Sequence, residues 1–169
     1  MLQQELQQEL TQEQVNALFQ QVCKEVSGII PFSDRIKKEI IINKHKTDLG
    51  LCRKNPLFKT FTIYLSKYLL KCDIKLIKEV IIHELIHTCD NCFNHGYNFK
   101  YYMNKVNRML GYNVTVRNKN KQFKEQIKSK YTIRCTKCGK EFTRNRINKH
   151  FTTIYSCKCG GKLLVEKNF

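Results

Sequence analysis

The segment HELIHTCDNCFNHG, residues 83–96, collects side chains that bind metals and transfer protons. His83 and His87 are four positions apart, so on a helix both imidazoles project from one face, close enough to share a single ion. Glu84 follows His83 and points beside that ion, where a base must stand to take a proton from a metal-activated water. A structural zinc site has four closed ligands and needs no such acid. The pattern therefore predicts a catalytic zinc site.

A catalytic zinc takes a third protein ligand and keeps its fourth position open. His95 is the candidate, because the seven residues after His87 let the chain leave the helix and return, and Gly96 permits a tight turn. Cys89 and Cys92 compete for this position. Two thiolates would close the site and cancel the Lewis acidity that makes zinc useful, so His95 is favoured. The two cysteines alternatively form a redox-sensitive pair, hold a second minor site, or pack the loop.

The helix that carries the motif is expected to lie at the centre of a domain. Asp73 can cap a helix through residues 74–89, and apolar side chains surround this helix almost completely. Two histidines and a glutamate on such a helix are costly to bury without a partner, and a metal ion supplies one.

A second set of metal-binding residues lies near the C-terminus. Cys135 and Cys138 have two residues between them, whereas Cys157 and Cys159 have one. Each pair is followed by glycine and resembles a knuckle of a zinc ribbon, in which four thiolates hold a structural zinc that staples a small module. The shortened second pair leaves His150 as an alternative ligand, although the spacing favours the all-cysteine site.

The segment between the two knuckles interleaves basic and aromatic side chains. This mixture suits single-stranded nucleic acid, because cations follow phosphates and aromatic rings stack on bases. Some of the aromatic residues must instead pack the small core of the ribbon. The candidate nucleic-acid contacts are Arg144, Arg146, Lys149 and Tyr155.

The net charge of +17 is unevenly distributed along the chain. Residues 1–116 carry 16 basic and 11 acidic side chains, a net +5, whereas residues 117–169 carry 15 and 3, a net +12. This excess points to a polyanionic partner, DNA or another nucleic acid before a membrane, since no amphipathic apolar helix accompanies it. The alternative is a lysine-rich composition that serves solubility.

The nine cysteines do not indicate a disulfide-bonded secreted domain. Their number is odd, and residues 1–10 lack the basic start and apolar stretch of a signal peptide. In a reducing compartment, paired cysteines more often bind metal. No apolar run approaches the roughly 20 residues of a membrane span. We therefore expect a protein of the cytoplasm, or of the nucleus in a eukaryote, without a membrane partner.

Periodicity and turn residues predict an α+β fold. A capping box at Thr11 and Gln14 begins a helix that ends before Gly28 and Pro31. Further expected elements are strands at 35–42, 48–53 and 60–66, the helix at 74–89, a helix at 97–110, and a short strand at 112–116.

The stretch IIHELIHTCDNCFNHGYNFKYYMNKVNRMLGYN, residues 81–113, resembles the active-site segment of the SprT-like metalloproteases, the family that includes Spartan. The shared features are HExxH, a third histidine in an HG pair, a phenylalanine three residues after that glycine, and a helix ending near Gly-Tyr. The resemblance covers about residues 11–169. It implies a zincin-like domain with a small antiparallel sheet, a catalytic zinc on His83, His87 and His95, Glu84 as base, a frequent C-terminal zinc ribbon, and proteolysis of DNA-associated proteins.

The expected organisation is a zincin-like protease domain at 1–116, a basic linker at 117–130 and a zinc ribbon at 131–169. The expected function is a zinc-dependent endopeptidase whose substrates are proteins bound or crosslinked to DNA, with one catalytic and one structural zinc. Two alternatives stay open: a non-proteolytic, zinc-containing nucleic-acid-binding protein, and a protease dedicated to one regulator without DNA dependence. The oligomeric state is not readable from the sequence.

Overall fold

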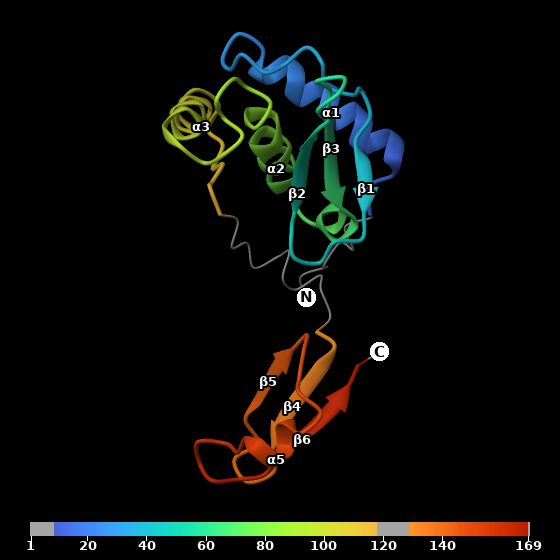
Figure 1. Cartoon of the computed structure of the whole chain (residues 1–169), viewed down its shortest axis with the longest axis vertical. Coiled ribbons are helices and arrows are strands. Elements are labelled where there is room, and N and C mark those ends of the chain that lie inside the picture. The colour runs from blue at the N-terminus through green and yellow to red at the C-terminus, as the bar shows by residue number, and fades with distance from the viewer. Residues whose placement is uncertain (1–8, 118–128, 169) are drawn as a thin grey trace, which may run out of the picture. The chain divides into compact units, whose positions relative to one another are not determined.

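A computed structural model describes residues 9–117 and 129–168. The chain divides into two compact units, residues 1–126 and 127–169 (Figure 1). Both contain helices and a small sheet, so the α+β class is confirmed. Most of the predicted basic linker, residues 117–130, lies outside the described residues. In the described parts of the chain, no helix is both long and apolar enough to cross a membrane.

Helix α1, Gln12–Val26, begins at the predicted capping box. The backbone N–H of Gln14 donates to Thr11 Oγ1, and Gln14 Oε1 accepts from the backbone N–H of Thr11. These two bonds satisfy amide groups that a helix start leaves unpaired. One face of α1 is buried through Val15, Leu18, Phe19, Val22 and Val26.

The sheet of the first unit is mixed, not antiparallel as the resemblance implied. Strands β1 (Ile41–Asn43), β2 (Gly50–Lys54) and β3 (Phe61–Ser66) are arranged in the order β1-β3-β2. Strand β2 pairs antiparallel with β3, whereas β1 pairs parallel with it. The chain reaches this arrangement by crossing the end of β3 between β1 and β2. Ser66 holds the crossing segment, since its hydroxyl donates to His45 O and its N–H donates to Leu49 O.

The strand predicted at 35–42 is wrong over most of its length. This segment of the chain forms a single bridge between Ile36 and Phe61 and then bends. A strand begins only at residue 41. Side chains of α1 take the hydrogen bonds that a ladder would have made: Asn16 Oδ1 accepts from the N–H of Ile40, and Gln12 Nε2 donates to its carbonyl. The Ile40 side chain is thereby held in the core.

Helix α2, Ile74–Ile86, is the central element of the first unit. It contacts α1, β2, β3 and α3, and most of its side chains are buried, as predicted (Figure 1). A short 3₁₀ helix, Lys67–Lys71, precedes it. Helix α2 ends three residues before the predicted end at residue 89. Beyond Ile86 the backbone changes to bonds three residues back: the N–H groups of Thr88 and Cys89 donate to the carbonyls of Leu85 and Ile86, and the Thr88 hydroxyl also donates to Leu85.

Helix α3, Tyr97–Leu110, ends as predicted at Gly111, which has the left-handed conformation with φ +70°. The strand predicted at 112–116 is not formed. Both amide atoms of the Asn107 side chain instead bind the backbone of Val114, and Glu79 accepts from the N–H of Asn113. Side chains of α2 and α3 thus replace a strand partner for this segment.

The second unit is a three-stranded antiparallel sheet with the order β5-β4-β6. Its strands are β4 (Tyr131–Cys135), β5 (Glu141–Arg144) and β6 (Leu163–Lys167), and a one-turn helix α5 (Phe151–Ile154) precedes β6. Ile133, Cys135, Phe151 and Leu163 form its core. A domain with such a small apolar core usually needs a bound metal or a disulfide to be stable.

Candidate functional site

Three histidine side chains converge between α2 and the start of α3. His83 Nε2 lies 3.2 Å from His87 Nε2 and 3.1 Å from His95 Nε2. The first two project from one face of α2, and His95 returns from the loop that follows it. The structure therefore brings together the three histidines that the sequence spacing predicts as one ligand group.

Backbone carbonyls fix the orientation of two of these rings. His83 Nδ1 lies 2.9 Å from the carbonyl oxygen of Thr115, and His87 Nδ1 lies 2.9 Å from that of Cys92. A carbonyl can only accept, so each Nδ1 carries the proton and each Nε2 presents its lone pair to the centre. This is the way metal-binding histidines are usually held from behind.

The three imidazoles are neutral near neutral pH. Burial and the neighbouring His87 lower the pKa of His83 to about 4. Burial also lowers the pKa of His87, and burial together with the charge of Arg117 lowers that of His95. Phe99 is fully buried beneath the cluster, with its ring centroid 4.7 to 4.9 Å from those of the three histidines.

The nitrogen spacing fits a zinc ion. A tetrahedral zinc with Zn–N bonds of about 2.0–2.1 Å holds its ligand nitrogens about 3.3 Å apart. Two nitrogens that both present lone pairs repel each other at 3.1–3.2 Å unless a cation or proton lies between them. Three neutral imidazoles leave one tetrahedral position for a non-protein ligand.

The Glu84 carboxyl group is buried beside the histidines, with only 5% of the residue exposed. Burial raises its pKa to about 8; the backbone N–H of Cys52 donates to it and opposes the rise, while the charge of Asp48 adds to it. Gly50 also packs closely against the carboxyl group, since a Cβ atom there would lie 2.6 Å from Glu84 Oε1. Strand β2 thus supplies both a hydrogen-bond donor and the close packing that hold this side chain.

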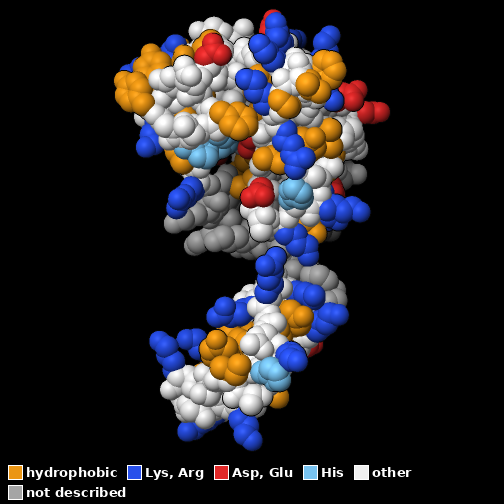
Figure 2. Space-filling view, in the orientation of Figure 1, with side chains coloured by type: hydrophobic (Ala, Val, Ile, Leu, Met, Phe, Trp, Pro, Cys, Tyr) orange, Lys and Arg blue, Asp and Glu red, His pale blue; other side chains and the backbone are white. Residues whose placement is uncertain are grey.

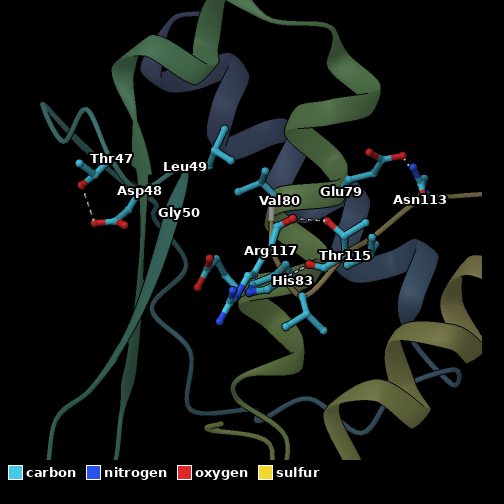
Figure 3. A pocket seen from close by; sticks show the side chains of 13 residues that line it. Thr47, Asp48, Leu49, Gly50, Glu79, Val80, His83, Asn113, Thr115 and Arg117 are labelled. Carbon is cyan, nitrogen blue, oxygen red and sulfur yellow. Dashed lines mark hydrogen bonds between the residues drawn. The ribbon is translucent and has the colours of Figure 1, made fainter. Parts of the chain in front are cut away.

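A cavity of about 280 Å³ opens at His83 and Glu84. The segments around Asp48 and Thr115 form its walls, and Arg117 extends beside His83 (Figure 3). Among the described residues, Arg117 is the only lysine or arginine in the lining of this cavity. The cavity gives a reacting group access to His83 and to the Glu84 carboxyl group.

The loop between His87 and His95 holds Cys89 and Cys92 in buried positions. Burial, with Cys92 and Asp90 nearby, raises the pKa of Cys89 to about 12, and burial and Asp90 raise the pKa of Cys92. Neither sulfur belongs to the three-histidine group. Cys92 contributes its carbonyl to His87 instead, so the loop packs around the site without adding thiolate ligands.

The four cysteines of the second unit also come together. Cys135 Sγ lies 3.5 Å from Cys159 Sγ, and Cys138 Sγ lies 3.6 Å from Cys157 Sγ. A tetrahedral zinc with Zn–S bonds of about 2.3 Å holds sulfurs about 3.8 Å apart. The shortened second knuckle is therefore compatible with the site, and His150 is not in the group.

Backbone groups and charge repulsion both act on these sulfurs. The backbone N–H groups of Cys138 and Lys137, which donate to the sulfur, lower the pKa of Cys135 to about 6. The N–H of Gly161 donates to Cys159, yet the three neighbouring thiols raise the pKa of Cys159 to about 12. Four adjacent sulfurs cannot all ionise without a cation between them, and a divalent metal supplies that charge.

Three of the four predicted nucleic-acid residues lie around one pocket. Arg144, Arg146 and Tyr155 line a hollow of about 390 Å³ in the second unit, whereas Lys149 lies outside it. All four side chains are exposed. The Phe151 ring is buried against the core and lies 5.0 Å from that of Tyr155, so part of the aromatic content does pack the ribbon.

Sequence reasoning missed several residues that complete the histidine site. Thr115 and Cys92 act through backbone carbonyls, which any residue type provides, so no sequence signal marks them. Gly50 had a signal, because glycine at the start of a strand often marks a close approach. Arg117 was counted only as part of the basic C-terminal third.

Three convergent imidazoles beside a buried carboxyl group form a set of side chains that could hold one metal ion, and zinc hydrolases use the same kinds of residues. The chain belongs to the SprT-like family, whose model matches residues 8–120 and confirms the resemblance. This membership indicates a zinc-associated domain of the metalloprotease type. No curated protein matches the sequence.

Proposed function

We propose that this protein is a zinc-dependent endopeptidase that acts on proteins bound or crosslinked to DNA. The observation that carries the proposal is the convergence of three Nε2 atoms next to the buried Glu84, with His83 and Glu84 both lining a cavity. A structural site does not require an acid in that position. We assign His83, His87 and His95 as ligands of a catalytic zinc.

When bound, zinc would supply Lewis acidity to the scissile carbonyl and lower the pKa of a water toward about 7. Glu84 is assigned as the catalytic base. A cation held by the neighbouring histidines would favour the ionised form of its carboxyl group and oppose the rise in pKa that burial causes. One carboxylate oxygen accepts a proton from the attacking water and later delivers it to the departing amine nitrogen. The N–H of Cys52 and the close approach of Gly50 hold the carboxylate in place for both transfers. Thr115 and Cys92 keep the His83 and His87 rings oriented.

The second unit is assigned as a zinc ribbon with a structural zinc on Cys135, Cys138, Cys157 and Cys159. Four thiolates leave no open position, so this metal would stabilise the fold and take no part in catalysis. The ribbon would then present Arg144, Arg146 and Tyr155 around one pocket, with Lys149 nearby, to single-stranded DNA.

The assignment of DNA rests on charge and on family membership. Residues 117–169 carry +12 of the net charge of +17, and Lys and Arg side chains are spread over the visible face of each unit (Figure 2). Cations that neutralise phosphates release counterions and so favour binding to nucleic acid. An enzyme recruited in this way would act where DNA is exposed, in the cytoplasm or, in a eukaryote, in the nucleus.

The direct test is cleavage of casein, and of the protein itself, by the zinc-loaded full chain, with and without single-stranded DNA and with a chelator. We expect cleavage that DNA stimulates and the chelator abolishes. Cleavage that DNA does not change would favour a protease dedicated to one regulator. DNA binding without any cleavage, under conditions in which both zinc ions are bound, would favour a non-proteolytic binding protein.

A further inference from the structure

The outward face of α3 carries aromatic and basic side chains that the proposed catalytic and ribbon sites do not use. A hollow of about 380 Å³ lies along this helix. Its lining residues all come from α3 and are Tyr97, Lys100, Tyr101, Asn104, Lys105 and Arg108. A volume of this order is typical of ligand-sized pockets.

The two tyrosines are unusually accessible for aromatic residues. Tyr97 is 83% exposed and Tyr101 is 54% exposed, so their rings contribute little to the core. The buried face of the same helix is formed by Phe99 and Val106. The outward rings are therefore available to a partner.

The charge on α3 has a single sign. The helix contains Lys100, Lys105 and Arg108 but no aspartate or glutamate. Among the residues that the structure describes, no ion pair involves these three cations. Cations without acidic neighbours attract an anionic partner, since nothing local compensates their charge.

The spacing of the tyrosines suits nucleobases. Tyr97 and Tyr101 are four residues apart, a rise of about 6 Å along the helix axis. Stacked rings lie about 3.4 Å apart. A single base stacked between the two tyrosine rings needs two such intervals, which is close to the rise between Tyr97 and Tyr101. Aromatic rings that alternate with cations are the usual means of binding single strands without sequence preference. An acidic peptide would use the cations but leave the two aromatic faces unexplained.

We infer that the outward face of α3 binds single-stranded nucleic acid, as a contact on the catalytic unit additional to the one proposed for the ribbon. Binding of nucleic acid to α3 does not depend on the proposed function, but the consequence of that binding for proteolysis rests on it. Tyr97 follows His95 by two residues, so a strand on α3 begins next to the histidine cluster. A protein attached to that strand is thereby delivered to the catalytic site.

The first test uses the zinc-loaded full chain and a fluorescent oligothymidine titrated at several salt concentrations. The variant Lys100→Gln/Lys105→Gln/Arg108→Gln removes three cations from α3. Its matched control, Lys37→Gln/Lys38→Gln/Lys44→Gln, removes three exposed cations near β1, away from α3 in Figure 1. Each phosphate contact on a single strand contributes about 0.7 to the slope of log K against log salt. We expect the α3 variant to make this negative slope less steep by about 2, and we expect the control to leave the slope nearly unchanged. Equal slopes for the two variants would overturn the inference.

The second test distinguishes stacking from charge. Tyr97→Ala/Tyr101→Ala is expected to weaken binding of oligothymidine about 5-fold or more but to leave binding of an abasic oligonucleotide unchanged. Photocrosslinking with 5-iodouracil should label the peptide that contains Tyr97 and Tyr101. Three results would each overturn the inference. The first is an equal effect on both oligonucleotides, and the second is the absence of label on that peptide. The third is displacement of the α3 contact by poly-glutamate but not by oligothymidine.

Cleavage of casein without DNA separates this inference from the proposed function. All α3 variants should retain zinc content and basal cleavage, because their residues are neither metal ligands nor part of the buried core. A protein that binds DNA through α3 but never cleaves would refute the peptidase proposal alone. A protein that cleaves but shows no α3-dependent binding would refute the α3 contact alone.

Discussion

Gly50 in β2 lies directly against Glu84 in α2, and a side chain at position 50 would collide with it. A Cβ atom there would stand 2.6 Å from Glu84 Oε1 and 2.8 Å from Val80 Cγ1. The strand can approach the helix this closely only because the residue has no side chain. The position of the proposed catalytic base is thus set partly from outside its own helix.

We expect Gly50→Ala to displace the Glu84 carboxylate and lower kcat about 10-fold or more, because small misplacements of a catalytic group are costly. Overpacking should also lower the free energy of unfolding by about 1–3 kcal/mol. Zinc content should be retained, since the histidines are held by other contacts. Adding Val80→Ala removes only the collision with Val80, so it should recover stability more than activity. Normal kcat in Gly50→Ala would contradict this positioning role.

Metal analysis tests the two ligand sets. The purified protein should contain two zinc ions per chain, and His95→Ala should lose or weaken one of them. Cys89→Ser/Cys92→Ser should keep two, because the Cys92 contact to His87 is made by the backbone carbonyl. Loss of the catalytic zinc in the double cysteine variant, with retention in His95→Ala, would show that the ligands are assigned wrongly.

The ion pair between Glu25 and Lys78 predicts an acid-sensitive part of the stability. Lys78 Nζ lies 2.7 Å from Glu25 Oε1, and the Tyr112 hydroxyl donates to Oε2 at 2.5 Å. Burial raises the pKa of Glu25, but Lys78, Tyr112 and Gln21 outweigh it and leave the pKa below its ordinary value. The stabilisation is therefore complete above the unfolded pKa of about 4.3 and is lost as the pH falls through the folded pKa.

We expect Glu25→Gln to be less stable than the natural protein at pH 7 by about 1–3 kcal/mol. The difference should shrink on acidification, as measured by urea unfolding of the metal-loaded protein between pH 7 and pH 4. Gln21→Ala should cause a smaller loss with the same pH dependence, because it removes one neutral partner of the same carboxylate. A stability difference that does not depend on pH would contradict the assigned ionisation.

The ribbon contact predicts a salt effect that is independent of base sequence. Arg144→Gln/Arg146→Gln should reduce the slope of log K against log salt for single-stranded DNA by about 1.4, at about 0.7 per contact. The loss should be similar for all sequences, since phosphate contacts carry no base information. Lys158→Gln/Lys162→Gln removes two cations outside the Arg144–Tyr155 pocket and is the matched control. Identical slopes for the two variants would contradict a DNA contact at Arg144 and Arg146 and would indicate that these charges serve solubility.

Local signals in the sequence were sufficient for the bounds of α1 and α3. The capping box at Thr11 and the terminal glycine at position 111 act within one turn, so the bounds of α1 and α3 follow from neighbouring residues. The histidine cluster was also accessible, because His83 and His87 are fixed by helical spacing and His95 by a short loop. These relationships need no knowledge of distant packing.

The parts that could not be predicted depend on contacts between distant residues. The first strand is shortened because Asn16 and Gln12 bind the backbone of Ile40, and the strand expected at 112–116 is replaced by contacts from Asn107. Neither partner can be recognised from the apolar pattern of the segment it binds. The approach of Gly50 to Glu84 likewise arises only once the sheet packs on α2.

The central claim is that Glu84 is the base of a zinc peptidase, and Glu84→Gln tests it most directly. The substitution keeps the size of the side chain and the three histidine ligands but removes the proton acceptor. Cleavage of a fluorescent casein and zinc content should be measured together in the full chain with single-stranded DNA present. We predict two zinc ions per chain and a loss of activity by a factor of about 100 or more. Near-normal cleavage by fully metallated Glu84→Gln would contradict the account.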